Sequence, residues 1–143
     1  MTFLLDVNVL IALIDPLHVH HLIANTWFEA TASSAWATCP IAENGVIRIV
    51  GGSRYPNSPG RPGPILTSLT ELCSLPGHRF WPDDLSLLST AKIDRTKLVS
   101  SSQVTDTYLL ALAVAHGGVL ATLDRRLSPD AVHGGAAALH VIG

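Results

Sequence analysis

Short apolar segments alternate with longer segments of helical character along this chain. The pattern predicts strands over residues 2–5, 35–38, 78–81 and 119–123, with a last apolar run over 139–142. It predicts helices over residues 7–14, 18–31, 41–50, 65–75, 83–90 and 104–116. Strands that alternate with helices form βαβ units, so we expect an α/β fold with a mostly parallel central sheet.

The chain has the size of one domain, which we expect to extend over residues 1–143. A domain of this length needs neither a disulfide nor a structural metal to fold. The one irregular stretch is residues 51–64, which contains four prolines and four glycines. Such a stretch continues neither a helix nor a central strand, and it is therefore predicted to be a surface loop.

Apolar residues make up 48% of the chain and charged residues only 14%, where about 25% is usual. This surplus predicts that a partner covers part of the surface, although a larger core would also account for it. The formal net charge is −2, so no overall basic field attracts nucleic acid. A polyanionic substrate would have to be held by bound metal and by local arginines.

Compartment is indicated by the cysteines and by the chain's apolar runs. Cys39 and Cys73 form no C-x-x-C pair and are expected to be reduced thiols of a cytoplasmic protein. No apolar stretch is long enough to span a bilayer, so we expect no membrane association. Asp6 interrupts the N-terminal apolar run and no basic segment precedes it, which argues against a signal peptide.

Four of the eleven acidic residues lie where predicted strands and helices meet, and an unpaired carboxylate beside apolar residues is costly. They are Asp6, Glu43, Asp106 and Asp124. Two follow strands and would project from one edge of the sheet, and two share helix faces with apolar residues. A shared divalent cation would turn the repulsion of four such acids into ligation.

Each acid also has a purely structural explanation. Asp6 could cap the helix that follows it, and Glu43 could pair with an arginine. Asp106 could interact favourably with a helix dipole, and Asp124 could form a turn or pair with the arginines after it. A site made only of carboxylate oxygens selects Mg²⁺ or Mn²⁺ over zinc. The histidines at positions 18, 20 and 21 suit capping and surface exposure better than metal ligation.

Four segments together carry a resemblance to a known family: LLDVNVLI at 4–11, AEN at 42–44, VTDTYLLALA at 104–113 and LATLDRR at 120–126. In this order and at these spacings they resemble PIN-domain ribonucleases, specifically bacterial toxins of the VapC type. The resemblance implies a three-layer α/β/α fold and Mg²⁺- or Mn²⁺-dependent endonuclease activity on RNA. It also implies a cognate antitoxin that blocks the site and, with the apolar surplus, a homodimer.

The same resemblance assigns roles to individual residues. The family's four acids, which bind the catalytic metal, fall on Asp6, Glu43, Asp106 and Asp124. Two polar positions that support the metal shell fall on Asn8 and Thr122. Apart from the resemblance, the position of Arg125 and Arg126 next to the acidic edge makes them the preferred contacts for RNA phosphates, with ordinary solvated charge as the alternative.

Two other classes of function remain open at this stage. Haloacid-dehalogenase-like phosphatases also place an acid after the first strand, but they need a second Asp where this chain has Asn8. A non-enzymatic Mg²⁺-binding interaction module would share the doubly wound fold, but it needs a lysine after a later strand, where this chain has Arg125. The acids alone favour a metal-dependent hydrolase, and the resemblance implies that it hydrolyses phosphodiester bonds in RNA.

Overall fold

The computed structural model describes residues 1–143, and its secondary structure follows the predicted alternation. The strands are β1 (Phe3–Leu5), β2 (Trp36–Thr38), β3 (His78–Phe80), β4 (Val119–Thr122) and β5 (Leu139–Val141). The helices are α1 (Val7–Ile14), α2 (His21–Trp27), α3 (Pro40–Val50), α4 (Gly63–Cys73) and α5 (Val104–Ala115). A π-helical turn, Phe28–Ala32, continues α2.

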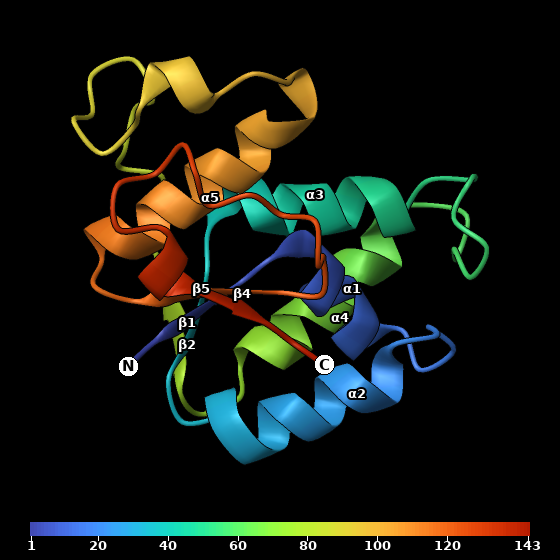
Figure 1. Cartoon of the computed structure of the whole chain (residues 1–143). Helices are drawn as coiled ribbons and strands as arrows, with labels where there is room; N and C mark the ends of the chain where they lie inside the picture. Colours follow the sequence, from blue (N-terminus) through green and yellow to red (C-terminus); the bar gives the residue numbers. More distant parts are fainter.

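All five strands are parallel and lie in the order β3-β2-β1-β4-β5. The connections through α1 to α4 run outward from β1 to β3, and the connection through α5 returns across the sheet to β4. Right-handed crossovers carry the connections through α1 to α4 along one face and the connection through α5 along the other. In Figure 1, α1, α2 and α4 lie on the side of the sheet opposite α5, whereas α3 runs past the carboxyl ends of the strands and packs on α1 and α4. This is the three-layer α/β/α arrangement that the sequence predicts.

The carboxyl ends of β1 and β4 lie side by side at the centre of the sheet, because Leu5 pairs with Ala121. The chain order reverses between these two strands, and ligands of open α/β sheets bind at such a point. Helix α5 crosses this region, and seven consecutive residues of it, from Thr107 to Ala113, are buried. The sheet and α5 therefore give the strand ends a rigid base.

Helix α3 approaches α1 closely at Gly45. A Cβ atom at this position would lie 2.9 Å from a methyl carbon of Val7, closer than real Cβ contacts. The hydrogen in place of a side chain therefore sets the distance between the two helices. Both helices border the site described below.

One predicted element is wrong. The helix predicted over 83–90 is absent, and the segment has no regular secondary structure apart from a turn at residues 87–89. The carboxylate of Asp83 accepts hydrogen bonds from the backbone N–H of Ile41 at 3.1 Å and from the hydroxyl of Tyr108 at 3.1 Å. These bonds hold the segment as a strap across the N-terminal ends of α3 and α5.

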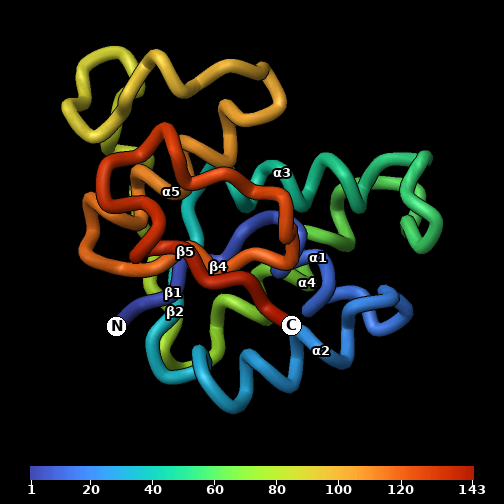
Figure 2. The backbone as a smooth tube through the Cα atoms, in the orientation of Figure 1, coloured from blue at the N-terminus to red at the C-terminus, as the bar shows by residue number.

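The predicted loop spans residues 51–62, because Gly63 and Pro64 already belong to α4. Figure 2 shows this loop extending away from the sheet beyond the C-terminal end of α3. Asp15, the C-terminal cap of α1, accepts hydrogen bonds from the Tyr55 hydroxyl and, at 2.9 Å, from the Asn57 amide. The loop is therefore fixed to α1 by its own side chains.

No helix of the structure is both long enough and apolar enough to cross a membrane.

Candidate functional site

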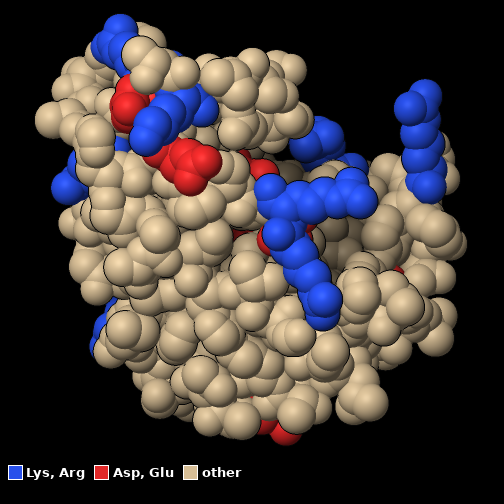
Figure 3. All heavy atoms as spheres, in the orientation of Figure 1, with Lys and Arg blue, Asp and Glu red and all other residues tan.

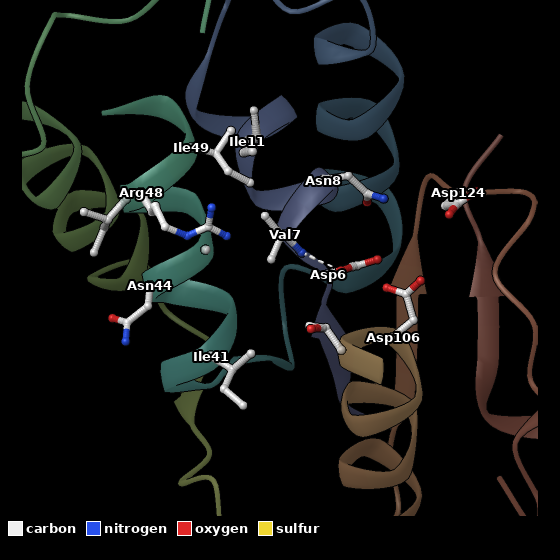
Figure 4. A pocket seen from close by; sticks show the side chains of 13 residues that line it. Asp6, Val7, Asn8, Ile11, Ile41, Asn44, Arg48, Ile49, Asp106 and Asp124 are labelled. Carbon is white, nitrogen blue, oxygen red and sulfur yellow. Dashed lines mark hydrogen bonds between the residues drawn. The ribbon is translucent and has the colours of Figure 1, made fainter. Parts of the chain in front are cut away.

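A pocket of about 810 Å³ opens at the carboxyl edge of the sheet, between α1, α3 and α5. Three of the four predicted acids line it: Asp6, Asp106 and Asp124. Figure 4 shows their carboxylates pointing toward one another from β1, α5 and β4. The other lining residues are Val7, Asn8, Ile11, Ile41, Asn44, Gly45, Ile47, Arg48, Ile49 and Thr105.

Asp6 is the most buried of the three acids, with only 5% of its surface exposed. Its Oδ1 accepts a hydrogen bond from the Val7 N–H at 2.7 Å, so it also caps α1. Burial raises the pKa of Asp6; the hydrogen bonds from Thr122 and Val7 lower it, and the charge of Asp124 raises it further. Capping and membership of the pocket are thus compatible roles for this residue.

Thr122 is fully buried and connects the polar groups of the pocket. Its hydroxyl donates to Asp6 Oδ2 at 2.8 Å and accepts from the Asn8 amide at 3.1 Å and from the Asp124 N–H at 3.1 Å. The Asn8 side-chain oxygen in turn accepts from the Leu123 N–H at 3.0 Å. This network fixes the orientation of Asp6 relative to the end of β4.

Asp106 lies in the first turn of α5, facing Asp6 and Asp124. Burial and the negative charges of these two acids raise its pKa from an ordinary 3.8 to about 6. Asp124 shapes the turn after β4, because its Oδ1 accepts the Arg126 N–H at 2.8 Å. The one salt bridge in the structure joins His116 to Asp84, so no cationic side chain neutralises the three pocket acids.

The structure does not bring Glu43 to the other three acids. Its carboxylate lies on the far side of α3, where Oε2 accepts a hydrogen bond from the Thr38 hydroxyl at 2.6 Å. There it lines a second pocket together with Cys73 and His78. No arginine pairs with it, so the salt bridge considered from the sequence is absent as well.

Three polar residues of the acidic pocket escaped the sequence analysis: Asn44, Arg48 and Thr105. Asn44 and Arg48 are four residues apart on α3, and this spacing puts them on one helix face. Figure 4 shows the Arg48 guanidinium extending from α3 toward Val7 at the wall of the pocket. The spacing of Asn44 and Arg48, one helical turn apart, could have indicated a polar helix face. Apolar residues surround both positions in the sequence, so the spacing was overlooked.

The two arginines that were predicted to contact RNA lie outside the pocket. Arg125 and Arg126 are exposed beside Asp124, and Arg125 donates to the Gly143 carbonyl at 3.2 Å. Figure 3 shows Lys and Arg side chains around a hollow in which acidic atoms are visible. The histidines at 18, 20 and 21 form no metal-binding group, and His21 instead bonds to the Ala12 carbonyl at 2.7 Å.

The chemistry of the pocket suits a hard divalent cation. Its converging donors are carboxylate oxygens, supported by hydrogen bonds and without a protein counter-charge. Mg²⁺ prefers oxygen ligands and retains several waters, so an open pocket with a few carboxylates meets its needs. Such a site can activate water next to a bound phosphate.

Comparisons with known proteins agree with this geometry. The family model described as "PIN domain" matches residues 3–129. The chain is 44% identical to "Ribonuclease VapC39" of Mycobacterium tuberculosis over 94% of this chain and 96% of that protein. It is 43% identical to "Ribonuclease VapC44" over 94% of each chain, and 40% identical to "Ribonuclease VapC29" over 97% of this chain and 96% of that protein, both from the same organism.

Proposed function

This chain belongs to the PIN-domain family, and we propose that it is a metal-dependent endoribonuclease that acts as the toxin of a toxin–antitoxin pair. The family and fold predicted from the sequence are thereby confirmed. The observation that carries the proposal is the convergence of Asp6, Asp106 and Asp124 in one open pocket without a cationic partner. The relatives' names supply RNA as the class of substrate.

The three acids are proposed to hold the metal, with Mg²⁺ or Mn²⁺ preferred by their oxygen donors. An ion held by Asp6, Asp106 and Asp124 would supply an activated water for attack on the phosphodiester and would offset negative charge on the phosphate. Thr122 and Asn8 keep the Asp6 carboxylate in the orientation that ligation requires. Glu43 lies in the second pocket, so we do not include it among these ligands.

Arg48 is proposed to bind the phosphate of the RNA next to the cleaved bond. It lines the acidic pocket from the α3 side and makes no salt bridge that would occupy its guanidinium. A guanidinium can bind a phosphate through two parallel hydrogen bonds. Arg125 and Arg126, exposed beside Asp124, are proposed to contact phosphates further along the strand.

Partners are also proposed. An apolar surface around α2 exposes Leu17, Val19, Leu22 and Ile23, which is consistent with burial against a protein. A second copy of the chain and a cognate antitoxin are the partners we propose, the antitoxin blocking the acidic pocket. RNA as the substrate and two free cysteines favour the cytoplasm as the compartment.

The decisive experiment compares RNA cleavage by the wild-type protein with cleavage by Asp6→Ala and Asp106→Ala, in Mg²⁺, Mn²⁺ or EDTA. We expect cleavage by the wild type with either metal, none in EDTA, and ends that carry 5′-phosphate and 3′-hydroxyl groups. Asp130→Ala, a change of an exposed acid outside the pocket, is the matched control and should cleave normally. Cyclic phosphate ends, or full cleavage in EDTA, would overturn the proposed mechanism.

Growth of cells that express the chain tests the toxin part of the proposal. Expression of the wild type should arrest growth, and Asp106→Ala should relieve the arrest while the protein remains folded. Hydrolysis of small phosphate esters without RNA cleavage would instead support the phosphatase alternative. Partner binding without cleavage under any metal would support a non-enzymatic module.

A further inference from the structure

A second group of metal-ligating side chains lies on the far side of α3, outside the acidic pocket. Glu43 comes from the first turn of α3, Cys73 is the last residue of α4, and His78 is the first residue of β3. Their carboxylate oxygen, sulfur and ring nitrogen all lie within 4.8 Å of one another. Three donors of three chemical types thus converge from three separate elements of the fold.

The buried hydroxyl of Thr38 lies beneath this group. It donates to Glu43 Oε2 at 2.6 Å, and its oxygen lies 2.7 Å from His78 Nε2. Thr38 is fully buried at the end of β2, so it gives the three donors a fixed common neighbour. The two short contacts hold the carboxylate and the imidazole close together around one buried hydroxyl.

The group is open on its other side. Glu43, Cys73 and His78 line one pocket together with Ile47, Leu66, Leu69, Thr70 and Ser74. All three are partly exposed, so an ion and a water molecule can reach them. No lysine or arginine forms a salt bridge with Glu43, and its charge lacks a protein partner.

We propose that Glu43, Cys73 and His78 form a second metal site, which takes Zn²⁺ with water as the fourth ligand. A thiolate and an imidazole select zinc, whereas the carboxylates of the acidic pocket select magnesium or manganese. Three protein ligands and one open position form a familiar tetrahedral zinc arrangement. The site is independent of the proposed nuclease activity, because none of its three ligands lines the acidic pocket.

Binding requires a small local adjustment. Zinc–ligand bonds of about 2.0–2.3 Å place tetrahedral donors about 3.3–3.8 Å apart, so donors that lie within 4.8 Å of one another must draw together by at most about 1.5 Å. His78 must turn a lone pair to the metal, which leaves the Thr38 hydroxyl bonded to Glu43 alone. The Cys73 thiol proton passes to solvent as the Zn–S bond forms.

Cobalt substitution tests the site directly. Added to the full-length, reduced and metal-free protein, Co²⁺ should produce a thiolate-to-cobalt charge-transfer band that saturates at one equivalent per chain, and Zn²⁺ should remove the band. Cys73→Ser should abolish the band. Glu43→Gln and His78→Gln should weaken Zn²⁺ binding by more than the roughly 10–100-fold typical of losing an outer hydrogen-bond partner.

Two controls identify the site. Cys39→Ser alters the other, buried cysteine and should keep the band. Asp106→Asn alters the acidic pocket and should keep it too, so failure of the nuclease proposal leaves this test intact. Zn²⁺ should also protect Cys73 from alkylation in the wild type, and less so in His78→Gln.

No charge-transfer band with Co²⁺, or a band that survives Cys73→Ser, would overturn the proposal. So would unchanged alkylation of Cys73 in saturating Zn²⁺, which would leave the three side chains as a hydrogen-bonded cluster around Thr38. Circular dichroism establishes that each variant is folded, and the Glu43→Gln and His78→Gln titrations decide the question if Cys73→Ser does not fold.

Discussion

The two pockets on either side of α3 differ in the chemistry of their donors. Asn44 and Arg48 face the pocket of three carboxylates, whereas Glu43 faces a pocket that also holds a thiol and an imidazole. Glu43 and Asn44 are neighbours in sequence, but successive helical residues point about 100° apart, since a turn takes 3.6 residues. Helix α3 thus separates a pocket whose donors are carboxylate oxygens from a pocket that combines a carboxylate, a thiol and an imidazole. Neighbouring residues such as Glu43 and Asn44 can therefore belong to different pockets.

The largest expected effect tests whether the pockets are functionally separate. Asp106→Ala should lower the rate of RNA cleavage by about 10²–10³-fold or more, the range for losing one preorganised electrostatic group. Glu43→Gln should cost less than about tenfold, because its carboxylate lies outside the acidic pocket. Single-turnover cleavage of one RNA by both variants measures this contrast. Equal losses would show that the two pockets act as one unit.

A smaller effect is expected beneath the acidic pocket. Thr122→Val keeps the shape of a buried side chain but removes the bond to Asp6 and the acceptor for Asn8. Cleavage at limiting Mg²⁺ should fall about 10–100-fold, with part of the loss recovered at high Mg²⁺. Thr122→Ser retains the hydroxyl and should restore most of the activity. A Thr122→Val protein with wild-type metal dependence would contradict the positioning role.

Arg48 should matter for RNA binding more than for metal binding. Arg48→Ala should weaken RNA affinity by roughly tenfold and reduce the salt dependence of binding by about one ionic contact. Arg48→Lys keeps the positive charge, so the salt dependence of RNA binding should match the wild type. It loses the two parallel hydrogen bonds that a guanidinium makes to a phosphate, so RNA cleavage should stay impaired. Binding is measured on uncleaved RNA in Ca²⁺ at several salt concentrations. An unchanged salt slope in Arg48→Ala would remove this residue from the RNA contacts.

The smallest effect concerns stability. The folded-state pKa of Asp106 is raised to about 6, so the folded protein holds a proton there that the unfolded chain has lost. Stability from this group is complete below pH 4 and disappears as the pH rises to about 6. Binding of Mg²⁺ at pH 7 should restore on the order of 1 kcal/mol of the free energy of unfolding, which corresponds to roughly 3–5 °C in Tm. The effect is small because solvent screens the partly exposed carboxylate.

Thermal unfolding from pH 4 to pH 7, with and without Mg²⁺, measures this effect. Asp106→Asn removes this charge and should lose less stability as the pH rises and gain less from Mg²⁺, while the buried Asp6 keeps its own contribution in both proteins. The difference between the two proteins isolates Asp106, because every other ionisable side chain is present in both. A wild type that gains no more from Mg²⁺ than Asp106→Asn would argue against metal binding at this acid.

Periodicity predicted most of the fold because the buried elements are strongly patterned. Helix α1 begins and ends at the predicted residues, and Pro40 begins α3. The helix predicted after Pro82 is wrong because the conformation of this segment is set by hydrogen bonds to distant partners, the Ile41 N–H and the Tyr108 hydroxyl. Local sequence carries no information about such bonds.

The site was predictable where acids follow strands and less so on helices. Asp6 and Asp124 follow adjacent parallel strands, so topology alone brings them to one edge. Glu43 shares a helix face with Ile47 and Val50, as predicted, but its carboxylate lines the pocket between α3 and α4, and of these residues only Ile47 borders both pockets. Periodicity defines the faces of a helix without saying which neighbour each face meets.

The residue at position 45 shapes the wall of the acidic pocket. A side chain there would meet the Val7 methyl group, so Val7 or the helices that carry the two residues would have to shift. A change at this one glycine would therefore alter the space between α1 and α3 without adding or removing a carboxylate.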